Sequence, residues 1–206
     1  MFFEPPPTQE DLTGPPHPSL PAWLAPPATE LGTSMAIDRV LVHNSTVAVA
    51  LSSVRAYSTG CLLNVEVVLR QNGLSPDAFW DLQMSLYPLA RIRSTGGDRL
   101  PDKLLRFGVR YADGTKATTV AANADPAGEP PKDTRLSWLP GGSTLRSGRD
   151  LGIHEVALWL WPVPPAEPFE FAVEWPVGGV GLTIVELDGA PIASAARRST
   201  TYWPSP

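Results

Sequence analysis

Hydrophobic and polar side chains alternate along most of the chain after residue 35, which is the pattern of β-strands with one face on a core. In the clearest run, 60–70, the odd-numbered residues from Cys61 to Leu69 are all apolar. The run 104–111 alternates in the same way, with Arg106 and Arg110 on its polar face. Shorter strand-like runs are 37–42, 46–54, 115–121 and 134–139, and 182–187 is a short apolar run. About eight short strands separated by turns predict an all-β antiparallel sandwich, with a closed barrel as the alternative, because alternation does not determine closure.

Two stretches carry the signals of helix starts, so one or two short helices are expected beside the strands. Ser75 precedes Pro76 and Asp77, which puts an N-cap serine before a proline and an acid in the first turn. Asp188 precedes an alanine-rich stretch that it can cap in the same way. Between 104–111 and 115–121 the pair Asp113-Gly114 predicts a tight hairpin, because these residues readily adopt positive φ.

Two aromatic-rich runs, 153–161 and 169–175, flank a proline-rich connection and are expected to pair as a hairpin. One face of this hairpin is entirely apolar and belongs to the core. Large aromatics beside carboxylates on the outward face are typical of interaction sites, which makes this face a candidate binding surface for a protein or the apolar side of a sugar. The alternative is that the arm or the C-terminal segment covers the tryptophans. The candidate residues are Trp159, Trp161, Glu155, Glu170 and Glu174.

Residues 1–34 form a proline-rich acidic arm ahead of a single domain, 35–206. The arm holds nine prolines and four acidic residues but no Lys or Arg, a composition that favours extended polyproline II structure. Phe2, Phe3, Trp23 and Leu24 are apolar anchors that a purely solvated linker would not need. Such an arm docks either on its own domain or on another chain, and the sequence leaves both readings open.

Charge and cysteine content exclude several classes of protein. The net charge is −5, of which the arm contributes −4, so the domain is nearly neutral and nucleic acid is not an expected partner. Cys61 is the single cysteine, so no internal disulfide forms. The chain shows neither a signal peptide nor a run of about 18 apolar residues, so we expect no membrane span and a cytoplasmic location.

Catalytic and metal-binding motifs are lacking in the sequence. His17, His43 and His154 are far apart and in no metal-ligand spacing. Glu170 and Glu174 share a strand face but lie about 13 Å apart along it, beyond the roughly 5–9.5 Å of glycosidase carboxylates. The glycine pairs 141–142 and 178–179 are expected to form turns. No catalytic residue, cofactor or metal is therefore predicted.

Several runs resemble those of a group of small actinobacterial hypothetical proteins. They are Val54-Arg55-Ala56-Tyr57, the stretch Leu104–Gly114, Leu158-Trp159-Leu160-Trp161-Pro162 and Glu174-Trp175-Pro176. The likeness covers roughly residues 45–190. It implies a source and a fold, and the group has no established activity to carry over.

Taken together, these features favour a non-enzymatic protein–protein interaction or assembly module, with a protein partner or a homo-oligomer. The anchor-bearing arm, the tryptophan-rich runs and the lack of catalytic motifs motivate this hypothesis. The alternative is a carbohydrate-binding sandwich, or a weak glycan hydrolase, that uses the face of Trp159 and Trp161.

Overall fold

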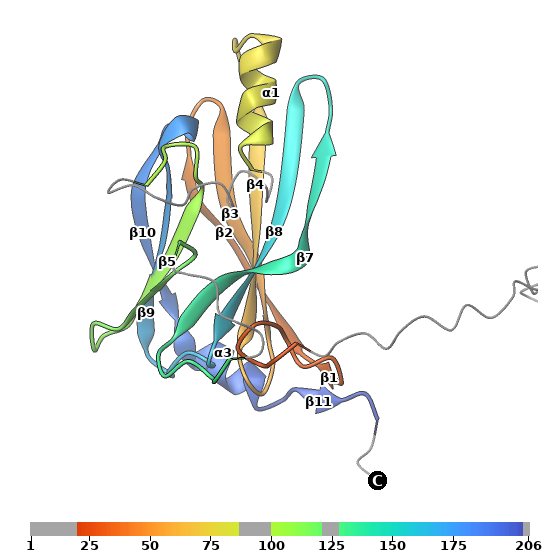
Figure 1. The fold of residues 1–206 in the computed structure, drawn as a ribbon, viewed down its shortest axis with the longest axis vertical. Helices are drawn as coiled ribbons and strands as arrows, with labels where there is room; N and C mark the ends of the chain where they lie inside the picture. Colours follow the sequence, from red (N-terminus) through yellow and green to blue (C-terminus); the bar gives the residue numbers. More distant parts are fainter. Residues whose placement is uncertain (1–19, 87–99, 121–127, 204–206) are drawn as a thin grey trace, which may run out of the picture.

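The computed structural model of the protein describes residues 20–86, 100–120 and 128–203, which form two facing antiparallel sheets and a small third sheet (Figure 1). The five-stranded sheet has the order β2-β3-β4-β8-β7 and the four-stranded sheet the order β10-β9-β5-β6. The third sheet pairs β1 with β11. Within the described residues each sheet stays open, so the all-β sandwich predicted from alternation is confirmed.

The strands of the five-stranded sheet are β2 Thr33–His43, β3 Val47–Ala56, β4 Cys61–Arg70, β8 Leu151–Trp161 and β7 Arg135–Ser147. Those of the four-stranded sheet are β10 Val180–Asp188, β9 Pro168–Trp175, β5 Arg106–Arg110 and β6 Lys116–Thr118. The third sheet consists of β1 Glu30–Leu31 and β11 Thr200–Thr201.

The core lies between the two larger sheets and takes every second side chain of their central strands. Strand β4 buries the odd-numbered residues from Cys61 to Leu69, as the alternation predicted. Across from it, Phe107 and Phe171 stack with ring centroids 5.8 Å apart, and Trp175 is fully buried. The period of two therefore leaves one outward face on each sheet for other roles.

The expected hairpin between 153–161 and 169–175 is not formed. Strand β8 pairs with β4 and β7, whereas β9 pairs with β5 and β10 in the opposite sheet. The connection 162–167 carries the chain across the sandwich. Alternation had assigned the inner faces correctly, but two runs that bury the same face can meet across a core as well as side by side.

The local signals at the two helices and at the second glycine pair are confirmed. Helix α1 spans Pro76–Met84, and the Ser75 side chain accepts a hydrogen bond from the Ala78 N–H. Helix α3 spans Gly189–Ala196, with the Asp188 carboxylate accepting from the Ala190 N–H. The short 3-10 helix η1, Pro176–Gly178, precedes Gly179, which has φ 67° as a turn glycine should. No helix in the described part of the chain is long and apolar enough to cross a membrane.

The first glycine pair lies inside a strand, which corrects the expected turn. Gly141 has φ 72° within β7, and the pairing register of β7 against β8 shifts between Trp138 and Ser143. Such a bulge uses the positive φ of glycine to bend a strand without ending it. Strand β7 consequently runs well beyond the predicted 134–139.

Candidate functional site

The five residues of the predicted binding surface do not lie on one surface. Glu155, Trp159 and Trp161 belong to β8 in the five-stranded sheet, whereas Glu170 and Glu174 belong to β9 in the four-stranded sheet. The two groups therefore face outwards on opposite sides of the sandwich. The prediction depended on the β8–β9 hairpin and is wrong for the same reason.

Trp159 is not a platform for a ligand, because the protein covers it. Its side chain is 0% exposed, and its Nε1 donates a hydrogen bond to the Ala22 carbonyl oxygen at 2.9 Å. Tyr57 packs edge-on against the indole, with ring centroids 5.8 Å apart. The C-terminal part of the predicted arm thus does what the alternative reading proposed. Trp161, two residues further on, is half-buried.

The covering segment, residues 20–31, is integrated into the domain at several points. Ser58 donates its backbone N–H to the Glu30 carboxylate at 2.8 Å, and Tyr202 donates its own to the Thr29 carbonyl at 2.9 Å. Trp23 and Leu24, two of the predicted anchors, are half-buried here. The other two, Phe2 and Phe3, lie outside the described residues.

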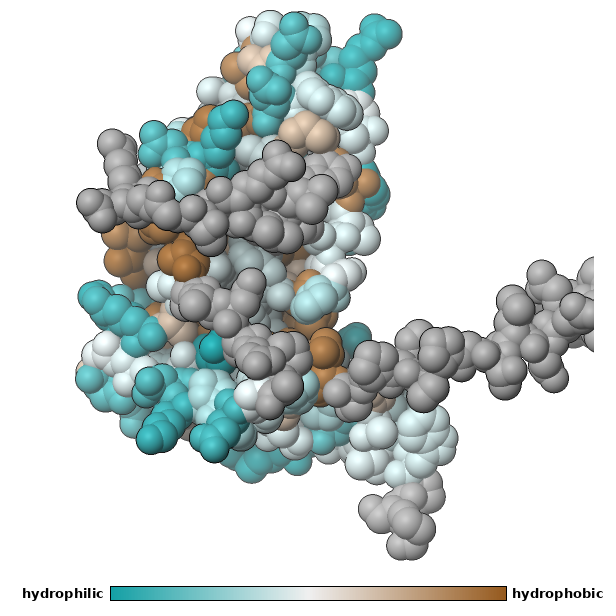
Figure 2. All heavy atoms as spheres, viewed as in Figure 1, coloured by the Kyte–Doolittle hydropathy of each residue, from teal (hydrophilic) through white to brown (hydrophobic). Residues whose placement is uncertain are grey.

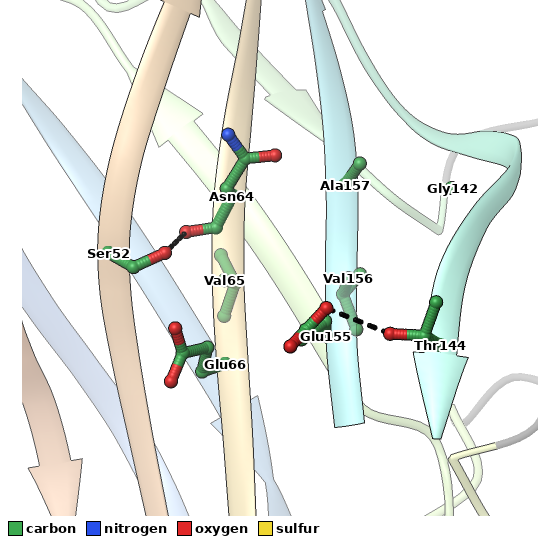
Figure 3. A pocket seen from close by; sticks show the side chains of 9 residues that line it. All are labelled: Ser52, Asn64, Val65, Glu66, Gly142, Thr144, Glu155, Val156 and Ala157. Atoms are coloured by element: carbon green, nitrogen blue, oxygen red, sulfur yellow. Dashed lines mark hydrogen bonds between the residues drawn. The ribbon is translucent and has the colours of Figure 1, made fainter. Parts of the chain in front are cut away.

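A polar groove of about 300 Å³ crosses the outer face of the five-stranded sheet (Figure 3). Glu66 and Glu155 lie directly opposite each other on β4 and β8. The Thr144 hydroxyl donates to the Glu155 carboxylate at 2.9 Å, and Arg146 forms an ion pair with it at 2.5 Å. Like charges in directly opposed positions disfavour each other, so Arg146 offsets a repulsion within the sheet. The other lining residues are Ser52, Asn64, Val65, Gly142, Val156 and Ala157.

The groove provides little for chemistry. Within the described residues, no three His, Cys, Asp or Glu side chains lie close enough to hold a metal ion. The predicted aromatic residue beside the carboxylates is missing from the lining, since Trp159 lies under residues 20–31. His154 points into the core next to Val67 rather than into the groove, as the opposed directions of His154 and Glu155 required.

Cys61 is also unsuited to catalysis. Its thiol is fully buried on the core face of β4, and burial raises its pKa from 9.0 to about 12. A thiol with so high a pKa stays protonated at neutral pH and is a poor nucleophile. The small buried cysteine is a packing residue, as the sequence indicated.

The outer face of the four-stranded sheet is the opposite case, because none of the described segments covers its apolar side chains. Leu182 and Ile184 on the edge strand β10 are 64% and 47% exposed. Ile184 is in register with Ala172 on β9, which is in register with Gly108 on β5. In Figure 2 a hydrophobic patch lies on the left of the molecule, in the region where Figure 1 draws β10 and β5. Exposed apolar groups gathered in this way are typical of contact surfaces.

Ion pairs flank the apolar centre of this face on two sides. Arg110 donates a hydrogen bond to Glu170 at 2.6 Å, and Arg106 Nε lies 3.2 Å from Glu174 Oε2. The hydrogen bond from Arg110 lowers the pKa of the Glu170 carboxyl, so Glu170 is ionised at neutral pH. Two carboxylates of the predicted surface therefore do belong to an outward face, but with arginine partners and without tryptophan.

A groove of about 190 Å³ runs over Gly108 in the centre of this face. Its lining includes the apolar residues Leu100, Val120 and Leu182 and the charged residues Arg106 and Glu174. The sequence analysis missed this site, because 182–187 has apolar residues on both of its faces and shows no alternation. The one available signal was Gly108, a glycine within an otherwise clean strand pattern.

Comparison with known proteins adds no assignment: no protein-family model, curated protein or solved structure matches the chain.

Proposed function

We propose that the protein is a non-enzymatic assembly module that binds a second copy of itself through the outer face of the four-stranded sheet. The observation that carries this proposal is the exposure of two large apolar side chains on β10, Leu182 at 64% and Ile184 at 47%. Full burial of one such side chain contributes about 1.5–3 kcal/mol, and a self-contact buries each of them twice.

The charges of this face favour a second copy as the occupant. Its outward side chains include three basic and three acidic residues, so the face as a whole is neutral and does not repel its own copy. A nucleic acid would require a basic face and a strongly charged protein partner a face of one sign. The six residues are Arg106, Arg110, Lys116, Glu170, Glu174 and Glu186.

The carbohydrate-binding hypothesis loses Trp159 as a stacking platform, and Trp161 is half-buried. Stacking on a sugar requires an accessible aromatic ring, and Trp159 is covered by residues 20–31. The carboxylates expected beside it lie in part on the other sheet. We therefore favour assembly as the function.

Sedimentation equilibrium from micromolar to submillimolar concentration tests the proposal. The wild-type protein is expected to self-associate, and Ile184→Glu should weaken the association by at least about 2 kcal/mol, or about thirtyfold, because it buries a charge. Leu151→Glu is the matched control, since Leu151 is 46% exposed but lies on β8. A wild-type monomer at every concentration, or equal effects of the two substitutions, would contradict the proposal.

A further inference from the structure

The strand register arranges the outer face of the four-stranded sheet into three rows that run across the strands. The first row reads Lys116, Arg110, Glu170 and Glu186 from β6 to β10, two basic residues followed by two acidic ones. The second row reads Thr118, Gly108, Ala172 and Ile184, three small residues followed by a large one. A third, shorter row pairs Arg106 on β5 with Glu174 on β9.

From these rows we infer how two copies meet: face to face, about a two-fold axis that runs parallel to the strands between β5 and β9. This inference rests on the self-association proposed above and adds its geometry. The rotation places each row against the same row of the second copy in reverse order. Face-to-face sheets pack with their strands aligned to within about 30°, which keeps the rows opposed over a face of this width.

All the charged positions are complementary in this arrangement. Arg110 and Lys116 of one copy face Glu170 and Glu186 of the other, and Arg106 faces Glu174. Because the axis is two-fold, each of these contacts forms twice. Opposed charges of this kind determine the orientation of a complex more than its raw affinity.

The apolar row is complementary in size. Ile184 of one copy lies over Thr118 of the other, and Gly108 lies over Ala172, so the large exposed side chain meets a small one. None of the described residues requires a glycine at position 108. A Cβ at this position would come no closer than 3.4 Å, to Thr118 Cγ2, which is an ordinary contact. Gly108 is buried in the single chain but lines the groove, and a glycine within a strand often marks a place where another backbone approaches closely.

The other two-fold arrangement is excluded by charge. An axis running across the strands would place the first row against the third. Arg110 would then face Arg106, and Glu170 would face Glu174. Like charges directly opposed across an interface disfavour the complex, so the register selects the axis parallel to the strands.

Cysteine cross-linking in the full chain tests the axis. Cys61 is fully buried and does not compete, so a short bismaleimide reports on introduced thiols alone. Thr118 and Ile184 are three strand spacings apart in one chain, about 14 Å, which is too far for a short linker. We expect an equimolar mixture of Thr118→Cys and Ile184→Cys to give a covalent dimer with one chain of each, and Ile184→Cys alone to give none. Thr118→Cys mixed with Leu151→Cys is the control, expected to give none.

The outcomes separate the geometry from the function. A covalent dimer from Ile184→Cys alone would overturn the axis while supporting self-association. A mixture that fails to cross-link although sedimentation shows a dimer would also overturn the axis only. A protein that is monomeric in sedimentation would overturn both.

Charge reversal provides a second test that does not depend on cross-linking. The variant Arg110→Glu/Lys116→Glu makes the first row wholly acidic, and Glu170→Arg/Glu186→Arg makes it wholly basic. Each variant alone is expected to lose at least about tenfold in self-association, because like charges then face each other. An equimolar mixture should recover association as a heterodimer. If folded variants, checked by circular dichroism, associate no better mixed than alone, the rows do not face each other and the inference fails.

Discussion

Outward apolar side chains are covered on one outer face of the sandwich and exposed on the other. On the five-stranded sheet, Trp159 points away from the core but is 0% exposed, because residues 20–31 lie over it and accept its indole N–H. On the four-stranded sheet, Leu182 remains 64% exposed. The difference shows that a position on the outward face of a strand does not by itself make an apolar side chain accessible, because a distant segment can cover it.

The largest expected effect is on the covered face. Trp159→Ala removes a fully buried indole with its edge contact to Tyr57 and its hydrogen bond to Ala22. The free energy of unfolding should fall by about 3–5 kcal/mol, as for other buried aromatics. Ile184→Ala on the other face is the control and should change monomer stability by less than about 1 kcal/mol. Urea unfolding measures both. Equal decreases in the free energy of unfolding would contradict the difference between the two faces.

Shortening the chain tests the cover itself. Deletion of residues 1–25 removes Ala22 and Trp23, whereas deletion of residues 1–19 leaves both in place. The longer deletion should lower the free energy of unfolding by about 2 kcal/mol more than the shorter one, because it exposes Trp159 and leaves its Nε1 without a protein acceptor. Trp159 fluorescence should shift to the red only in the longer deletion. Identical stability of the two deletions would show that residues 20–25 do not act as a cover.

Substitutions of one glycine on each face, Gly60 and Gly108, are expected to have smaller and different effects. A Cβ at Gly60 would lie 2.5 Å from the Leu160 carbonyl oxygen and 2.7 Å from Trp159 Cζ2, so Gly60→Ala should cost about 1–3 kcal/mol of stability. Among the described residues, a Cβ at Gly108 meets nothing closer than 3.4 Å. Gly108→Ala should therefore leave thermal unfolding nearly unchanged and weaken self-association instead. The reverse result would mean that Gly108 serves the fold of the single chain.

The smallest effect concerns the core that both faces share. Burial raises the Cys61 pKa from 9.0 to about 12, so the folded protein keeps its thiol protonated where the unfolded chain ionises. Stability should then fall as the pH rises from 9.0 towards 12, because the unfolded state binds fewer protons than the folded state. Denaturant midpoints at pH 8 and pH 10 measure this, with Cys61→Ala as the control that lacks this contribution. An equal drop in both proteins would assign it to other groups.

The sequence predicted the faces of individual strands well and their neighbours poorly. The buried side of β4, the capping residues Ser75 and Asp188 and the turn at Gly114 all follow from local chemistry. The pairing of β8 did not, because alternation reports which side of a strand is buried and not which strand lies beside it. The ion pair of Arg110 with Glu170 depends on that pairing and could not be foreseen.

The two surfaces differed in how far the sequence revealed them. The sequence allowed Trp159 to be either a binding surface or covered by another part of the chain. The residues around it do not distinguish an aromatic under a distant segment from one in solvent. The sequence did not predict that Ile184 is exposed. Its neighbours Thr183 and Val185 could face either the core or the solvent, so the run shows no alternation. Only the register between strands, which is a property of the fold, brings Ile184 into one row with Gly108.

Hydroxyl-radical footprinting at low and high protein concentration tests the central claim most directly, because it reads both faces in one experiment. Oxidation of Leu182 and Ile184 is expected to slow as the concentration rises, while oxidation of Leu151 stays constant and Trp159 is protected at every concentration. Oxidation rates at Leu182 and Ile184 that do not depend on concentration would contradict the assembly face. Rapid oxidation of Trp159 would contradict its cover by residues 20–31.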